Sequence, residues 1–142
     1  MPAVISYLID TSAAARLLIN PTVRKAWHET VTAGVVALCD PVELELLFTA
    51  RSLADRLRKK EILVELFGWA ATPDNAWSRA HQVQQLLTEH GHHRSAGVAD
   101  LLIAATAEAN KLTILHYDRD FETVAKATGQ PTQWIAPPGT IA

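Results

Sequence analysis

The fold is decided by the apolar stretch Val98-Ala99-Asp100-Leu101-Leu102-Ile103-Ala104-Ala105-Thr106-Ala107. Between Ala96 and Ala107 the only charged side chain is that of Asp100, and no Lys or Arg lies within one helical turn of it. An ionised carboxylate in an apolar segment is costly unless a cation pairs with it. Two explanations stay open: Asp100 caps the start of a buried helix, or it faces a bound cation together with other acids.

The composition is that of a globular domain with a substantial core. The chain has 142 residues, of which 49% are hydrophobic and 20% charged, so disorder is not expected. The net charge is -2, so binding to nucleic acid would have to rest on local basic patches. No apolar run approaches the roughly 18 residues of a membrane span, and Met1-Pro2-Ala3-Val4 lacks the basic region of a secretory signal. We therefore expect a cytoplasmic protein without a membrane segment.

Predicted strands and helices alternate along the chain. Apolar runs predict strands at residues 4–9, 35–39 and 112–116, with shorter ones at 69–72 and 132–135. Helical patterns and caps lie between them, at residues 13–19, 22–32, 41–50, 52–67, 74–91, 98–110 and 121–128. This alternation predicts an α/β fold with a central, mainly parallel twisted sheet of four to five strands, flanked by helices. With no repeat or linker in the sequence, we expect one domain over residues 1–142.

Four carboxylates fall near the ends of these strands. Asp10 directly follows the first strand, and Asp118 follows the strand at 112–116. Glu45 lies early in the helix after the second strand, and Asp100 lies in the first turn of its helix. Carboxyl ends of parallel strands meet at one edge, so these acids would repel each other unless divalent cations neutralised them. Oxygen ligands suit Mg²⁺ or Mn²⁺, which can activate water for phosphodiester cleavage.

Glu43 competes with Glu45 for the role of metal ligand. The segment Asp40-Pro41-Val42-Glu43 is typical of a helix start, with Asp40 as N-cap and Glu43 completing a capping box. That structural role for Glu43 favours Glu45 as the ligand.

The sequence resembles a known family of proteins. The motifs that carry the resemblance are Leu8-Ile9-Asp10-Thr11-Ser12-Ala13, Glu45-Leu46-Leu47, Asp100-Leu101-Leu102-Ile103-Ala104-Ala105-Thr106-Ala107 and Asp118-Arg119-Asp120-Phe121. In this order they resemble the successive motifs of PIN-domain nucleases, in particular the VapC toxins of VapBC toxin–antitoxin modules. The resemblance implies a PIN-like α/β/α sandwich and a Mg²⁺-dependent endoribonuclease, with Mn²⁺ as a substitute, acting on tRNA, rRNA or mRNA. It also implies a homodimer and a VapB-like antitoxin that covers the active-site groove.

The same resemblance implies roles for particular residues. The implied catalytic residues are Asp10, Glu45, Asp100 and Asp118. Asp10, Asp100 and Asp118 would hold the metal. Glu45 acting through water and Asp120 as a fifth acid stay open. Thr11 and Ser12 would orient Asp10 and cap its helix.

Two positions depart from the family pattern. His116 stands where the family often has Thr or Ser, and Thr49-Ala50 replaces a frequent Gly-Ala pair. His116 could be a general base or an RNA contact, but an imidazole bonded to a nearby carboxylate is the favoured interpretation. The loop histidines His90, His92 and His93 resemble a metal cluster, yet adjacent loop positions rarely give metal geometry. We expect a solvated loop there, with RNA contact left open.

The predicted helix at 52–67 carries two further candidate surfaces. The basic residues are Arg51, Arg56, Arg58, Lys59 and Lys60. They predict either a solvated face or a rim that contacts RNA phosphates. The apolar residues are Leu53, Leu57, Leu63, Leu66 and Phe67. They predict a groove for an antitoxin helix or a dimer surface.

Two other functions remain as alternatives. A PIN-scaffold protein could bind RNA or a partner protein without turnover, although all four acids are present. A phosphatase of the haloacid-dehalogenase type would use Asp10 as nucleophile and needs a second Asp two positions on, where Ser12 stands.

Overall fold

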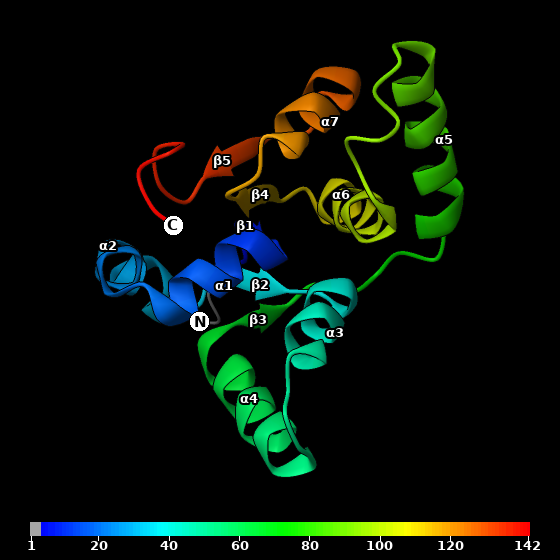
Figure 1. Ribbon diagram of the computed structural model, residues 1–142. Coiled ribbons are helices and arrows are strands. Elements are labelled where there is room, and N and C mark those ends of the chain that lie inside the picture. Colours follow the sequence, from blue (N-terminus) through cyan, green and yellow to red (C-terminus); the bar gives the residue numbers. More distant parts are fainter. Residues whose placement is uncertain (1–3) are drawn as a thin grey trace.

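The computed structural model describes residues 4–142 and shows strands stacked side by side with helices on both sides (Figure 1). Residues 1–3, which belong to the N-terminal segment without the basic region of a secretory signal, lie outside the described residues. Within residues 4–142 the strands are β1 (Tyr7–Ile9), β2 (Val36–Leu38), β3 (Gly68–Trp69), β4 (Thr113–His116) and β5 (Thr132–Trp134). The helices are α1 (Thr11–Ile19), α2 (Pro21–Thr32), α3 (Asp40–Phe48), α4 (Leu53–Leu66), α5 (Ala76–Glu89), α6 (Val98–Asn110) and α7 (Asp120–Thr128).

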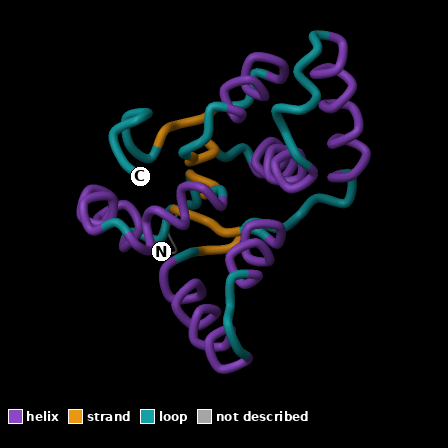
Figure 2. Tube along the Cα trace, viewed as in Figure 1, coloured by secondary structure: helices purple, strands orange, loops and turns teal. Residues whose placement is uncertain are grey.

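The sheet has the order β3-β2-β1-β4-β5, and every pairing between neighbouring strands of the described chain is parallel. Leu8 pairs with Ala37 on one side and with Ile114 on the other, so β1 and its neighbours form the middle of the sheet. Consecutive strands are joined through helices, as Figure 2 shows. The predicted α/β fold with a mainly parallel sheet is therefore confirmed, and the strands end together at one edge.

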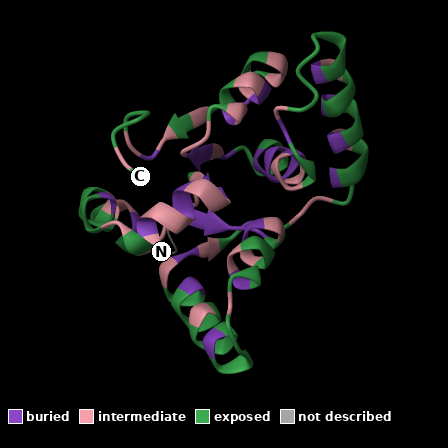
Figure 3. Ribbon diagram, viewed as in Figure 1, coloured by how far each residue is buried: buried purple, intermediate pink, exposed green. Residues whose placement is uncertain are grey.

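The central strands are short and buried on both faces. Leu8, Ile9 and Ile114 are fully buried, and Figure 3 shows buried residues concentrated in the middle of the sheet, whereas the edge strands β3 and β5 are partly exposed. Strands of this kind occur as continuous apolar runs in sheets covered by helices on both sides. The outer faces of α4 and α5 are exposed, so the apolar core lies between the sheet and the inner faces of the helices.

Helix α6 is the helix that the apolar stretch of the sequence predicted, and it is largely buried. Six of its residues are buried: Leu101, Ile103, Ala104, Ala105, Thr106 and Ala107. The Thr106 hydroxyl donates to the carbonyl of Leu102, which satisfies this buried polar group within the helix. Against this buried surface α5 packs the stripe Ala76, Ala80, Val83 and Leu87. No helix in residues 4–142 has the length and apolar composition needed to cross a membrane.

Side-chain caps mark several helix starts. Asp10 caps α1, Asn20 caps α2 and Ser52 caps α4, each by accepting a backbone N–H. The predicted cap by Asp40 is wrong. Asp40 is already the first helical residue of α3, and Cys39 occupies the N-cap without a side-chain hydrogen bond. The expected capping box between Asp40 and Glu43 is therefore not formed.

Candidate active site

Asp10 lies at the carboxyl end of β1, at the point where the chain turns into α1. Its side chain is only 3% exposed and accepts a hydrogen bond from the backbone N–H of Ala13 at 2.9 Å. The Ser12 hydroxyl donates to the same carboxylate and lies 2.8 Å from both of its oxygens. Burial raises the pKa of Asp10 to about 6, although these hydrogen bonds lower it, and the negative charge of Asp100 raises it further.

Ser12 also connects the two central loops at this edge. Its hydroxyl oxygen accepts the backbone N–H of Tyr117 at 2.9 Å, directly after β4. One hydroxyl therefore holds the Asp10 carboxylate and the loop that leads to Asp118. The sequence did not predict this link because Ser12 and Tyr117 are separated by 105 positions. Strand pairing between β1 and β4 is what brings them together.

Asp100 occupies the first turn of α6, and both explanations offered for it above find support in its surroundings. Its carboxylate accepts the backbone N–H of Gly97, the N-cap of α6, at 3.1 Å. Burial is the main cause that raises its pKa, and this N–H bond lowers it. The negative charges of Asp118, Glu45 and Asp120 raise it further. Asp100 is thus a helix-capping residue that also faces the other acids.

Glu45 reaches this edge from α3. The Thr11 hydroxyl donates to its carboxylate at 2.6 Å, which links the start of α1 to α3. Glu43 instead accepts a hydrogen bond from Lys60 on α4 at 3.0 Å. The structure therefore gives Glu43 a structural partner, although not the predicted capping box, and leaves Glu45 beside the acids.

Asp118 and Asp120 follow β4 and complete the cluster. The Asp118 carboxylate accepts the backbone N–H of Asp120, the first residue of α7, at 2.9 Å. Burial raises the pKa of Asp120, as does the neighbouring Asp118. We call Asp10, Glu45, Asp100, Asp118 and Asp120 the acid cluster.

His116 does not have the carboxylate partner that the sequence predicted. It is fully buried, and its Nδ1 accepts the backbone N–H of Asp118 at 3.1 Å. Its Nε2 has no hydrogen-bond partner among residues 4–142. Burial lowers its pKa, which favours the neutral imidazole, and the ring lies 4.8 Å from that of Trp134. His116 therefore positions the Asp118 backbone, and its burial is incompatible with direct contact to RNA in this conformation.

The acid cluster fits a divalent cation held partly through water. Across residues 4–142, no three His, Cys, Asp or Glu side chains converge closely enough to enclose a metal ion. The charge of Asp100 nevertheless raises the pKa of Asp10, other acids of the cluster raise that of Asp100, and the cluster offers oxygen ligands alone. Mg²⁺ usually keeps several waters and takes only one or two carboxylates directly, so a closed ligand cage is not required.

The predicted basic residues form a partly paired surface at α4. Arg58 and Lys59 contact Asp55 at 3.6 Å and 3.2 Å, and Lys60 contacts Glu43. Neither Arg51 nor Arg56 has an ion-pair partner within the described part of the chain. In Figure 1, α4 extends away from the sheet below β3.

The apolar residues predicted as a groove on this helix divide into two sets. Leu63 and Phe67 are core residues that also line hollows, and Leu66 is partly buried against the core. Leu53 and Leu57 are exposed, as is Phe48 at the end of α3, where 90% of the side chain is accessible. A hollow of about 380 Å³ lies between α1, α3 and α4. It is lined by Ala15, Leu18, Ile19, Leu46, Thr49, Lys59, Ile62 and Leu63, and we call it the apolar groove.

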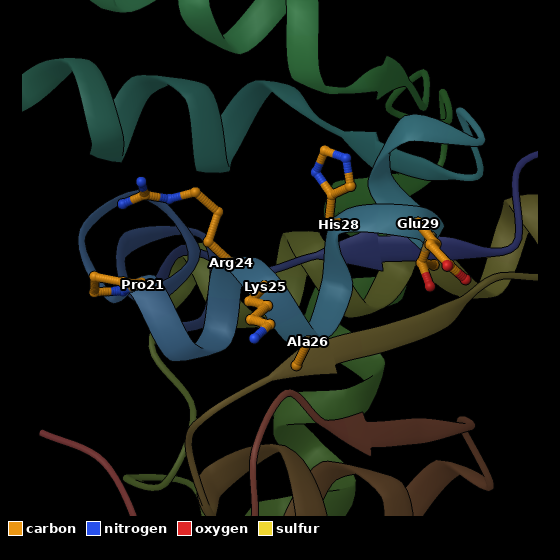
Figure 4. A pocket seen from close by; sticks show the side chains of 7 residues that line it. Pro21, Arg24, Lys25, Ala26, His28 and Glu29 are labelled. Atoms are coloured by element: carbon orange, nitrogen blue, oxygen red, sulfur yellow. The ribbon is translucent and has the colours of Figure 1, made fainter.

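A larger hollow of about 630 Å³ follows α2. Figure 4 shows Arg24, Lys25, His28 and Glu29 projecting from that helix in different directions. None of the predicted site residues lines it. The Arg24 guanidinium donates to the carbonyl of Leu18 at 3.1 Å, so it satisfies a carbonyl group at the C-terminal end of α1. Size alone therefore does not locate the active site in this molecule.

Comparison with known proteins agrees with this geometry. The PIN-domain profile matches residues 7–127, and Ribonuclease VapC21 of Mycobacterium tuberculosis is 40% identical over 134 residues. The chain is a PIN-domain protein of the VapC family. The match covers 94% of this VapC protein and 96% of that relative. Ribonuclease VapC18 of the same organism is 42% identical over 142 residues, covering 95% and 98%.

Solved structures show the same fold. The VapC protein superposes on a chain of the DNA-bound VapBC of Salmonella typhimurium with a TM-score of 0.76 and 19% identity, covering 93% of this chain and 99% of the other. VapBC-1 of nontypeable Haemophilus influenzae gives a TM-score of 0.74 at 17% identity, with 92% and 98% covered. The predicted PIN-like sandwich is therefore confirmed.

Proposed function

We propose that this VapC protein is the toxin of a type II toxin–antitoxin module, an endoribonuclease that hydrolyses phosphodiester bonds of RNA. The observation that best supports this function is the acid cluster at one edge of the sheet. There the charge of half-buried Asp100 raises the pKa of buried Asp10, and other acids of the cluster raise that of Asp100. Such repulsion is relieved by a divalent cation. The relatives named Ribonuclease VapC support the choice of RNA as substrate.

PIN-domain VapC ribonucleases generally depend on a divalent metal ion. We propose Mg²⁺, with Mn²⁺ as a substitute, held among Asp10, Asp100 and Asp118, by one or two of these carboxylates directly and otherwise through water. Glu45 and Asp120 would contact the ion through water. When bound, the ion supplies an activated water and stabilises the charge that develops on the phosphate oxygens.

The remaining contacts describe what the chain itself contributes. Ser12 and the Ala13 N–H hold the Asp10 carboxylate, and Thr11 holds that of Glu45. His116 fixes the backbone that carries Asp118. These bonds keep the carboxylates of three separate segments in place before substrate arrives, so little reorganisation is needed during the reaction.

We propose that the apolar groove receives a helix of a VapB-like antitoxin. The groove presents apolar side chains from α1, α3 and α4, which suits an amphipathic helix. The cations at α4 would meet acidic residues of that segment or RNA phosphates. Solved neighbours that are VapBC complexes support this partner. We further propose a cytoplasmic homodimer in which residues 1–142 form one PIN domain.

An RNA cleavage assay tests the proposed activity. Purified protein should cut structured RNA in Mg²⁺ or Mn²⁺, and chelation should stop cleavage. Asp10→Asn and Asp100→Asn should each abolish it, while circular dichroism shows that both variants remain folded. Glu108→Gln, which changes an acid at the far end of α6 paired with Arg79, is the matched control and should keep activity. Equal cleavage by wild type and Asp100→Asn would contradict the proposal.

A binding protein without turnover remains the second candidate, because the acids in residues 4–142 do not form a closed metal cage. The same assay separates the two functions. RNA binding without cleavage in any divalent ion would favour the binding protein.

A further inference from the structure

A basic hollow lies between the end of α5 and the outer part of α7. It measures about 300 Å³ and is lined by Leu87, His90, His92, Thr123, Lys126 and Ala127. Three of these side chains carry nitrogen donors: two follow the end of α5 and one lies on α7, and these two helices pack together. None of the predicted catalytic acids belongs to it.

The nitrogen groups of this hollow are available for a ligand. Within residues 4–142, the side chains of His90, His92 and Lys126 make no hydrogen bond to protein and no ion pair. The two imidazole rings lie 6.5 Å apart and are tilted by 32°. The nearest acid on α7, Glu122, accepts the Trp134 indole N–H at 2.7 Å and so has a partner on β5. Lys126 therefore brings a positive charge without an ion-pair partner to this hollow, on a chain whose net charge is -2.

An anion fits this hollow better than a metal ion does. The ammonium group of Lys126, which lines the hollow together with the two imidazoles, would repel a cation. Imidazole N–H and ammonium groups are typical donors to phosphate oxygens. Lys126 acts as a point charge, so the hollow would bind phosphate without selecting a base.

The position of the hollow relates it to the acid cluster. Helix α7 begins at Asp120, beside Asp118, and Lys126 lies on the same helix. With a rise of 1.5 Å per residue, Lys126 stands about 9 Å along the axis from Asp120. A nucleic-acid strand advances about 3.4 Å per nucleotide in a helix, so this span corresponds to roughly two or three nucleotides.

We propose that His90, His92 and Lys126 bind a backbone phosphate of the RNA substrate on one side of the cleaved bond. This inference rests on the proposed ribonuclease function and adds a substrate-binding subsite to it. It also gives a role to the histidine loop, which is a binding element for phosphate and not a metal centre. RNA that reaches from the acid cluster to the hollow is held by charge at two points.

Binding of single-stranded RNA, measured by fluorescence anisotropy in chelator so that nothing is cut, tests the subsite. Lys126→Gln should weaken binding about threefold to tenfold at low salt. The slope of log affinity against log salt should become shallower by about 0.7, because the variant neutralises one phosphate fewer. The double variant His90→Gln/His92→Gln should weaken binding in the same direction. Lys25→Gln on α2 removes an exposed cation elsewhere and should leave affinity and slope unchanged.

The outcomes separate this subsite from the ribonuclease function. If wild type cleaves RNA and Lys126→Gln binds RNA with unchanged affinity and slope, the subsite is wrong and the function stands. If wild type never cleaves but binding depends on Lys126, the ribonuclease function is wrong, and the hollow is supported only as a phosphate site of an RNA-binding protein. An equal loss in Lys25→Gln contradicts the subsite, because general charge attraction then explains binding. Saturation of the His90 and His92 NMR signals by inorganic phosphate as tightly as by RNA also contradicts it, and indicates a free-anion site.

Discussion

The Thr11 hydroxyl donates a 2.6 Å hydrogen bond to the Glu45 carboxylate, across 34 positions of the sequence. The bond joins the first residue of α1 to α3, the helix that follows β2. Glu45 is therefore held toward the acid cluster by the residue next to Asp10. The segments that follow β1 and β2 are thus joined, and this bond positions Asp10 and Glu45 at the same edge of the sheet.

Loss of this bond should reduce activity with little effect on folding. Thr11→Val keeps the shape of the side chain and removes the donor, so Glu45 is free to turn away. We expect RNA cleavage to fall about tenfold, while the free energy of unfolding changes by about 1 kcal/mol or less, because the bond is exposed. Thr11→Ser keeps the hydroxyl and should keep activity. Unchanged cleavage by Thr11→Val would show that Glu45 needs no support from Thr11.

Asp10→Asn should stabilise the metal-free protein at neutral pH. Burial raises the Asp10 pKa from 3.8 to about 6, so the folded state disfavours the ionised carboxylate. The stability that the neutral form provides is fully present below pH 3.8 and is lost as the pH rises through about 6. Removing the charge should therefore raise the free energy of unfolding at pH 7 by about 1–3 kcal/mol. Denaturant unfolding in chelator measures this, and a destabilised variant would contradict it.

Metal affinity should rise steeply between about pH 5 and pH 7. The ion binds the carboxylate form of Asp10, whose pKa is raised to about 6, so binding must displace a proton at lower pH. Calorimetric titration of Mn²⁺ in two buffers of different ionisation enthalpy measures the protons released. Release of a fraction of a proton or more at pH 5.5, falling toward zero at pH 8, is expected. A pH-independent affinity would mean that Asp10 is not a ligand.

His116→Phe should make folding less sensitive to acid. Burial lowers the pKa of His116, so its contribution to stability is fully present above the ordinary histidine pKa of about 6.5 and is lost as the pH falls. Phenylalanine keeps the contacts with Phe121 and Trp134 but cannot be protonated. The variant should lose less stability than wild type between pH 7 and pH 5. It should also bind Mn²⁺ more weakly, because the Asp118 N–H loses its acceptor. Identical acid sensitivity would argue against a buried neutral imidazole.

A polar substitution in the apolar groove should impair antitoxin binding and spare cleavage. Ile62→Asn places an amide among the lining residues and should weaken binding of the cognate antitoxin about tenfold or more. Val64→Asn lies on the same helix, is exposed and does not line the groove, so it is the matched control. Calorimetric titration with the antitoxin compares the two. Equal effects would place the antitoxin elsewhere.

The sequence predicted the parts of the molecule that depend on local pattern and on the rules of parallel sheets. Continuous apolar runs indicated buried strands, and Asp10 and Asp118 could be placed because each follows such a run. The buried stripe of α5 and the burial of α6 also follow from residue spacing.

Contacts between distant residues could not be predicted in this way. The bond from Tyr117 to Ser12 exists only because β1 and β4 pair. The sequence predicted a carboxylate partner for His116. Instead, the ring is buried against Trp134, and its Nδ1 accepts the backbone N–H of Asp118. A shift of one residue in the start of α3 removed the capping box at Asp40, which local sequence cannot resolve.

Titration of Mn²⁺ against wild type and Asp100→Asn at neutral pH, followed by electron paramagnetic resonance, tests the metal-dependent acid cluster most directly. The negative charges of Asp118, Glu45 and Asp120 all raise the pKa of Asp100. Wild type should bind Mn²⁺, and Asp100→Asn should bind it about tenfold more weakly or worse, a loss of about 1.4 kcal/mol or more. Equal binding by the two proteins, or no binding by wild type, would contradict a metal site at the acid cluster.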